Sequence, residues 1–230
     1  MASYSLESAL INNKQRNLKL NKPKVVLLLG KPRRGKTHAL KHLILSQVKH
    51  SSNPFQYGVV FTGSDFSDEY SWIKPEFVCS DYSDDKLQIW LQQLKDKHPK
   101  IPHTFIVFDD LVGLINQSRG YWTNFVCNHR HYNVTIFITA QYLMRGVSPT
   151  FRECVNFAIL FNSKTYITLK AIHESFGQLF ESFKEFKAHF LRITVPKFQA
   201  MLYDQDKEFL QGNYVSYKAP KKIPRVMLRF

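Results

Sequence analysis

A glycine-rich segment directly follows a run of apolar residues near the start of the chain, in the sequence VVLLLGKPRRGKTHAL at residues 25–40. It fits the pattern G-x-x-x-x-G-K-[ST] of a phosphate-binding loop, with the required strand before it and helix after it. In such a loop, backbone N–H groups at a helix N-terminus surround the phosphates. Lys36 would reach the β- and γ-phosphates, and Thr37 would hold Mg²⁺. The residues expected to contact the nucleotide are Gly30, Lys31, Pro32, Arg33, Arg34, Gly35, Lys36, Thr37 and His38.

Two aspartates end the apolar segment TFIVFDD at residues 104–110. A buried strand of this kind delivers a carboxylate at its C-terminal edge, and in P-loop enzymes that carboxylate, here Asp109, orders the water shell of Mg²⁺. Asp110 then takes the place of the acid that orients or deprotonates the attacking water. Because Asp is one methylene shorter than Glu, Glu69, in the loop after the second predicted strand, is an alternative base.

A further buried strand is predicted in VTIFITAQ at residues 134–141. It would place Thr139 and Gln141 between the strand that leads into the loop and the strand that ends in Asp109. Gln141 is expected to sense the γ-phosphate and to hydrogen-bond the lytic water. Such an intervening strand is typical of motor-type P-loop ATPases with a catalytic acid, whereas nucleotide kinases and GTPases mostly lack it.

Several arginines surround this strand and the loop. Arg130 precedes the strand, and Arg145 and Arg152 follow it. An arginine contributed by a neighbouring subunit would stabilise charge on the transferred phosphoryl group, which requires a ring. Arg130 is the first candidate for this finger and Arg145 the second. Arg33 and Arg34 either contact phosphate in cis or extend into solvent, and we favour the second interpretation.

Histidines and cysteines do not indicate a zinc site. The histidine pairs at positions 38 and 42 and at positions 129 and 131 lack a third ligand. The three cysteines are odd in number and form no CxxC pair, which favours a reducing compartment over a disulfide framework.

Apolar runs alternate between strand and helix periodicity along the chain. Strands are predicted at residues 25–29, 57–61, 77–79, 104–109, 134–139, 157–161 and 198–203, and helices at 36–49, 85–97, 121–130 and 163–190. The alternation predicts an α/β fold with a parallel central sheet and helices on both faces. We expect an N-terminal extension at 1–22, one P-loop ATPase domain at 23–205 and a basic C-terminal tail at 206–230.

The composition is typical of a protein that binds polyanions. The 230 residues carry a formal net charge of +14, and a surface of that sign favours DNA, RNA or acidic lipid as partner. The apolar runs are strand-length, so we expect no membrane span. The N-terminal residues contain no apolar leader, so we expect a protein that is not secreted.

The segments GKPRRGKT, FIVFDD and HRHYNVTIFITAQ, in this order and spacing, resemble the genome-packaging ATPases of poxviruses, other large DNA viruses, virophages and Maverick-type elements, which belong to the FtsK–HerA superfamily. The resemblance covers about residues 24–161. It implies a P-loop NTPase fold of the ASCE type, RecA- or FtsK–HerA-like, with ATP and Mg²⁺ as cofactors. By likeness, the nucleotide and metal residues are Lys36 and Thr37, the acids Asp109 and Asp110, the sensor Gln141 and the trans finger Arg130.

The resemblance also implies partners and a location. It describes a homo-oligomeric ring of five or six subunits that pushes double-stranded DNA into a preformed capsid. The ring would contact DNA phosphates without reading sequence, and would dock on capsid or portal vertex proteins. The expected location is the host cytoplasm, a viral factory or the virion.

Other functions use the same type of site. A P-loop helicase or replication ATPase would act on single-stranded DNA and would usually carry a further nucleic-acid-binding domain. An assembly factor would use bound ATP as a structural clamp without being a motor. A nucleotide kinase is disfavoured by the net charge, by the strand that leads to Gln141 and by the absence of an obvious lid segment.

Overall fold

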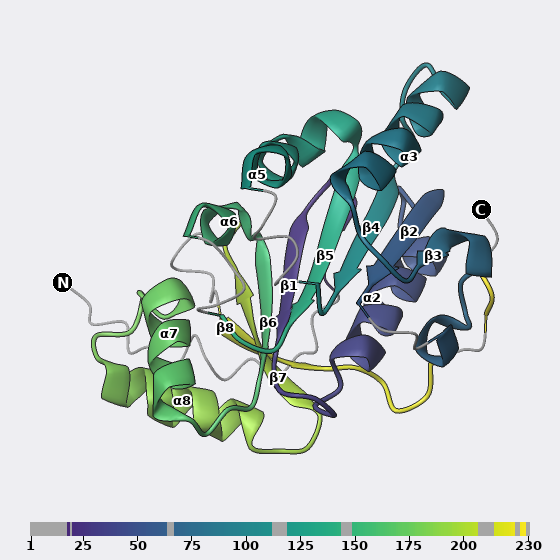
Figure 1. Ribbon diagram of the computed structural model, residues 1–230. Helices are drawn as coiled ribbons and strands as arrows, with labels where there is room; N and C mark the ends of the chain where they lie inside the picture. The colour runs from purple at the N-terminus through teal and green to yellow at the C-terminus, as the bar shows by residue number, and fades with distance from the viewer. Residues whose placement is uncertain are drawn as a thin grey trace.

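The computed structural model describes residue 18 and residues 20–63, 67–111, 119–143, 149–206, 214–223 and 226–228. Within these residues, eight strands form a single sheet in the order β3-β2-β4-β5-β1-β6-β7-β8 (Figure 1). The strands are β1 Val25–Leu29, β2 Tyr57–Thr62, β3 Val78–Cys79, β4 Thr104–Asp109, β5 Val134–Ala140, β6 Phe157–Phe161, β7 Gln199–Asp204 and β8 Tyr214–Lys218.

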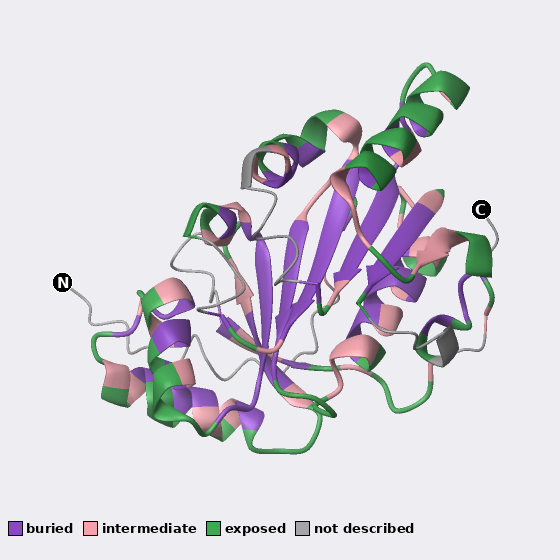
Figure 2. Ribbon diagram, in the orientation of Figure 1, coloured by how far each residue is buried: buried purple, intermediate pink, exposed green. Residues whose placement is uncertain are grey.

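The central strands are buried on both faces, which explains their continuous apolar sequences. Every residue of β1, β5 and β6 is buried, and Figure 2 shows the middle of the sheet as the buried part of the molecule. Along β1, Val25, Leu27 and Leu29 pack into the core on one face of the sheet. Val26 and Leu28 pack into the core on the other face. The alternation follows from the period of two in a β-strand.

Helices cover both faces of the sheet, as predicted. The helical segments are α2 Lys36–His50, η1 Ser67–Tyr70, η2 Pro75–Phe77, α3 Asp84–Lys97, α5 Arg119–Asn128, η3 His129–Tyr132, α6 Pro149–Cys154, α7 Tyr166–Phe176 and α8 Phe183–Thr194. α2 packs on one face, and α3, α5, α6, α7 and α8 pack on the opposite face, which is turned toward the viewer in Figure 1. Among the described residues, no helix has the length and apolar composition needed to cross a bilayer.

The prediction of a parallel sheet is correct for β1 to β6 and wrong for β7, which runs antiparallel to both of its neighbours. The reason lies in the segment predicted as one helical region at 163–190. It forms two helices, separated by residues 177–182. α7 and α8 pack against each other, so the chain comes back to the end of the sheet at which β6 stops. β7 therefore starts beside the end of β6 and runs antiparallel to it, with Phe161 paired to Ala200.

The C-terminal segment is part of the same fold. β8 and α6 were not predicted, and β8 is a strand of the sheet rather than part of a separate tail at 206–230. Beyond β8 the chain crosses α2, where His38 Nε2 lies 2.7 Å from the Pro220 carbonyl oxygen. Further on, the Leu228 N–H donates to the Trp72 carbonyl oxygen at 2.7 Å, and the Leu228 side chain is buried. Residues 1–17 of the expected N-terminal extension lie outside the described residues.

Candidate nucleotide site

The loop between β1 and α2 is held tightly against the sheet. The Gly30 N–H donates to the Ala140 carbonyl oxygen at 3.0 Å, which fastens the loop to the end of β5. A Cβ atom at Gly30 would lie 2.7 Å from Phe161 Cβ, so this position requires glycine. Gly35 has φ 99°, in the left-handed region that favours glycine, and precedes the first residue of α2. The glycine spacing therefore reflects two separate steric requirements.

The predicted contact residues of the loop lie at this same edge of the sheet. Lys36 Nζ donates to the Gly30 carbonyl oxygen at 2.7 Å, which holds the ammonium over the loop. Thr37 is half-buried in the first turn of α2, where its hydroxyl can serve a cation. Residues 31–34 of the loop are exposed, including both arginine side chains, and Arg33 has φ 61°.

Three hydrogen bonds, made by Thr139 in β5 and by Gln141 directly after it, hold the acid pair at the end of β4. The Thr139 hydroxyl donates to Asp109 Oδ1 and accepts from the Asp110 N–H at 3.2 Å. Gln141 Nε2 donates to Asp110 Oδ2 at 2.6 Å. β5 pairs in parallel with both β1 and β4, so the polar end of the intervening strand lies between the loop and the acids. The predicted juxtaposition of the loop, the acids and Gln141 is therefore present in the structure.

Lys36 shares its surroundings with three carboxylates. Burial lowers the pKa of Lys36. The charges of Asp110, Asp109 and Glu69 act in the opposite direction, in that order of strength. The structure thus brings Glu69, on η1, into the electrostatic environment of the same lysine, where its side chain is exposed.

Tyr70 is a site residue that the sequence did not reveal. Its side chain is 1% exposed, and its hydroxyl lies beside the Asp109 carboxylate. Burial raises the pKa of Tyr70 well above its usual range, and the charge of Asp109, a hydrogen bond to Asp109 and the charge of Glu69 add to this shift. A buried hydroxyl needs a polar partner, and Asp109 is the group that Tyr70 helps to position. Tyr70 directly follows Glu69 in the sequence, and this is the feature from which it could have been predicted as a site residue.

Of the candidate finger arginines, Arg130 does not lie at this edge in the same chain. Arg130 is exposed on η3, immediately before β5 begins, whereas Gln141 follows the end of that strand. Since a strand rises about 3.3 Å per residue, the length of β5 separates Arg130 from the loop by about 20 Å. Arg152, on α6, donates from Nη1 to Ser175 Oγ at 2.6 Å. Arg145 lies outside the described residues.

The cysteines are closer in space than their spacing indicates. Cys127 Sγ and Cys154 Sγ lie 3.6 Å apart on α5 and α6, and both are free thiols. This pair lies near the Arg130 end of the sheet, because α5 precedes η3 and α6 precedes β6.

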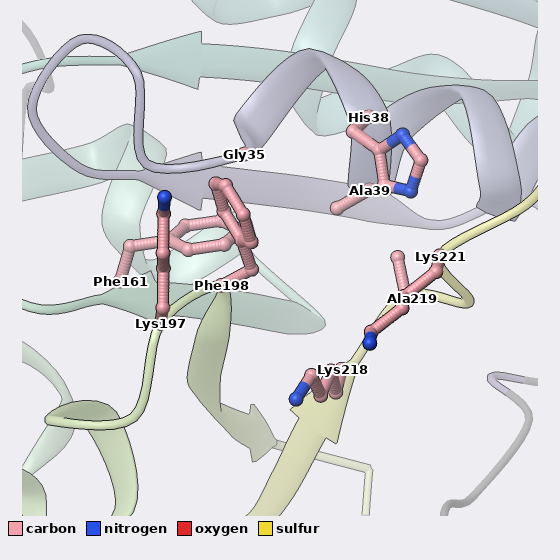
Figure 3. A pocket seen from close by; sticks show the side chains of 9 residues that line it. All are labelled: Gly35, His38, Ala39, Phe161, Lys197, Phe198, Lys218, Ala219 and Lys221. Atoms are coloured by element: carbon pink, nitrogen blue, oxygen red, sulfur yellow. The ribbon is translucent and has the colours of Figure 1, made fainter.

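A cavity of about 480 Å³ opens beside the first turn of α2. Figure 3 shows its two walls: His38 and Ala39 on the helix, and the segment after β8 on the other side. The Phe161 and Phe198 rings lie at one end, next to Gly35. The cavity therefore adjoins the phosphate-binding loop.

The donor set fits a magnesium nucleotide. The Thr37 hydroxyl and the Asp109 carboxylate are hard oxygen ligands, and Mg²⁺ in nucleotide sites takes one or two protein ligands together with phosphates and water. The backbone of the loop and Lys36 provide the positive surroundings that phosphates require. In the described part of the chain, no group of three His, Cys, Asp or Glu side chains gathers to hold another type of metal ion.

No protein-family model and no curated protein sequence matches this chain. Solved structures do match it. The genome-packaging NTPase B204 from Sulfolobus turreted icosahedral virus 2, in complex with AMPPCP, aligns with a TM-score of 0.61 at 16% identity, over 86% of this chain and 98% of that one. The pCW3 conjugation coupling protein TcpA aligns with a TM-score of 0.60 at 14% identity, over 88% of this chain and 61% of TcpA. The cytoplasmic domain of the type VII secretion ATPase EccC from Thermomonospora curvata aligns with a TM-score of 0.54 at 14% identity, over 85% of this chain and 25% of EccC.

These likenesses establish the fold. The chain shares the α/β fold of these NTPases and ATPases, with a mostly parallel sheet and helices on both faces, and the predicted α/β fold class is confirmed.

Proposed function

We propose that this chain is an ATP-hydrolysing, DNA-translocating motor that packages double-stranded viral DNA into a preformed capsid. The observation that carries the proposal is the convergence of the phosphate-binding loop, the acid pair and Gln141 at the ends of three adjacent parallel strands. The fold likeness to a packaging NTPase, over 98% of that protein's length, supports the packaging role. The net charge of +14 supports a polyanionic track.

Each residue of the site has a task in hydrolysis. Bound Mg²⁺–ATP would supply a γ-phosphoryl group whose transfer to water releases the free energy that drives movement. The loop N–H groups and Lys36 bind phosphate oxygens and neutralise their charge. Thr37 and Asp109 would hold the cation, which would neutralise charge on the phosphates. Asp110, oriented by Gln141, accepts the proton of the attacking water.

The proposed assembly is a homo-oligomeric ring of five or six subunits. Arg130 lies at the edge of the sheet opposite the loop, so it can act only on a nucleotide bound to a neighbouring subunit. A ring also encloses duplex DNA, and Lys and Arg side chains facing its channel would contact phosphates without reading sequence. Capsid or portal vertex proteins would be its docking partners, in the host cytoplasm or a viral factory.

Displacement of a third strand from duplex DNA tests movement directly. A motor that moves along duplex DNA removes a triplex-forming oligonucleotide placed on its track, and does so only with hydrolysable ATP. We expect the full chain to displace the third strand and Lys36→Ala to fail. Lys49→Ala, a substitution in the last turn of the same helix, serves as the matched control and should keep full activity. Hydrolysis without any displacement would contradict the motor.

A further inference from the structure

The cavity beside the loop has a composition that the hydrolytic site does not explain. It is lined by Gly35, His38, Ala39, Phe161, Lys197, Phe198, Lys218, Ala219 and Lys221. Among these described lining residues, none is a carboxylate or a carboxamide. The walls are therefore apolar and aromatic, with lysine ammonium groups around them, as Figure 3 shows. Such a cavity suits a flat apolar ring that carries an anionic substituent.

Phe198 adopts an unfavourable conformation at the end of this cavity. It has φ 62°, a region that bulky side chains rarely adopt, and its side chain remains 50% exposed. Neither feature stabilises the fold. Strained residues concentrate at ligand sites, where the surrounding structure holds them in place. The Phe198 ring is close to the loop, because a Cβ atom at Gly35 would lie 3.3 Å from Phe198 Cδ1.

The Phe198 ring has an ammonium group close by. Lys197 Nζ lies 5.0 Å from the centroid of the Phe198 ring, a cation–π geometry. An aromatic base would stack on the ring face that Lys197 leaves free, and base–aromatic stacking is a strong and sequence-tolerant contact. The lysine would then lie close to the sugar and phosphate of the same ligand.

The position of the cavity identifies which part of a nucleotide would occupy it. Phosphates bound by the loop lie at the N-terminus of α2. The cavity begins at Gly35 and continues along His38 and Ala39, immediately beyond Lys36 and Thr37. Neither aspartate of the acid pair lines this cavity, so it is open to a nucleoside attached to those phosphates.

We infer that Phe198 and the segment after β8 form the nucleobase subsite, which takes a purine by stacking and does not discriminate adenine from guanine. The inference rests on the proposed function, because it places the base of the same nucleotide. The His38–Pro220 contact at 2.7 Å holds the segment after β8 over the helix, so the C-terminal part of the chain forms the outer wall of the subsite. Discrimination of the purines would need a buried donor or acceptor at the base edge, and the lining side chains provide none.

Calorimetric titration of the full chain with Mg²⁺–ATP, Mg²⁺–GTP and inorganic tripolyphosphate tests the subsite. Removing a stacking ring weakens binding by about 5- to 150-fold. We therefore expect Phe198→Ala to lose ATP and GTP affinity within that range and to bind tripolyphosphate as the unchanged protein does. Phe198→Trp should restore the nucleotide affinity. Phe198→Asn, which tolerates positive φ, should repeat the Ala result without adding strain.

Controls separate the subsite from the loop. Ile89, on α3 and on the opposite face of the sheet from α2, is about as exposed as Phe198. Ile89→Ala should therefore leave the affinities for ATP, GTP and tripolyphosphate unchanged. Equal losses of ATP and tripolyphosphate in Phe198→Ala would mean that the ring only supports the loop, which overturns the inference. Unchanged ATP affinity, or a preference between ATP and GTP of about 1,000-fold or more, would also overturn it. If the unchanged protein binds neither ATP nor tripolyphosphate, the proposed nucleotide site itself is wrong.

Discussion

At the scale of single residues, the site is organised by one strand that carries no acid. Thr139, near the end of β5, bonds both aspartates of the pair at the end of β4, and Gln141, directly after β5, donates to the Asp110 carboxylate. Asp110 has φ 56°, a left-handed conformation in which its N–H reaches the Thr139 hydroxyl. The two carboxylates therefore have different surroundings: Asp109 is half-buried and Asp110 is exposed to solvent.

Replacement of Asp110 distinguishes the two candidate bases. Asp110→Asn keeps an oxygen that can accept from Gln141 but loses the basic carboxylate. Because general bases typically contribute 10²- to 10⁴-fold, we expect hydrolysis to fall by about two orders of magnitude or more, with ATP binding retained. Glu69→Gln, measured in parallel, should keep most of the turnover. The reverse pattern would assign the base to Glu69.

Tyr70→Phe tests the buried hydroxyl beside Asp109. Since the hydroxyl hydrogen-bonds the Asp109 carboxylate, its removal should lower the free energy of unfolding by about 1 kcal/mol. The Mg²⁺ concentration needed for half-maximal hydrolysis should rise, because Tyr70 holds the carboxylate that would order the water shell of Mg²⁺. Tyr217→Phe, which removes a hydroxyl that contacts His42 Nδ1 at 3.2 Å, is the control and should lower stability. A stability loss in Tyr70→Phe with an unchanged Mg²⁺ requirement would contradict this role.

At the scale of elements, the sequence predicts the half of the sheet that forms the site. β1, β4 and β5 are mainly apolar runs. β1 is followed by Gly30, the first glycine of the loop, whereas β4 and β5 are followed by Asp110 and Gln141, so both the strands and their ends are visible in the sequence. β8, with the sequence YVSYK, has only two fully buried residues and resembles a surface segment. The reversal at α7 and α8 depends on how two helices pair, which no local periodicity encodes. Tyr70 and Phe198 were missed for the same reason, since their roles arise from tertiary placement.

The segment after β8 is an integral element of the fold, which makes a measurable prediction for stability. Leu228 is 5% exposed, and Leu→Ala substitutions in cores cost about 2–5 kcal/mol. We expect Leu228→Ala to lower the free energy of unfolding by about 2 kcal/mol or more in a urea titration. Met227→Ala, at a neighbouring position that is 51% exposed, should change it by less than about 0.5 kcal/mol. Equal effects would mean that this segment does not pack on the domain in solution.

At the scale of the whole molecule, the proposed role of Arg130 requires a neighbouring subunit, because Arg130 and the loop occupy opposite edges of the sheet. We expect Arg130→Ala to retain ATP affinity and to lose hydrolysis by about 10³-fold or more in the assembled ring. His131→Ala, at the neighbouring exposed position, should have little effect. Unchanged hydrolysis in Arg130→Ala would mean either that Arg145 is the arginine finger or that hydrolysis uses no arginine from a neighbouring subunit.

The net charge of +14 predicts that the affinity of the protein for any nucleic acid depends strongly on salt concentration. Binding through phosphates releases counterions, so affinity falls steeply as salt rises, and it does so for any sequence. A helicase and a packaging motor share this property and differ in the strand that stimulates them. The comparison of duplex with single-stranded DNA therefore decides between them.

The measurement that tests the central claim most directly is steady-state ATP hydrolysis by the full chain alone, with duplex DNA and with single-stranded DNA, across a salt series. The account predicts strong stimulation by duplex DNA of any sequence, lost at high salt and absent in Lys36→Ala. Stimulation by single strands alone would contradict the packaging motor and indicate a helicase. ATP binding without hydrolysis under every condition would contradict the motor and indicate a clamp.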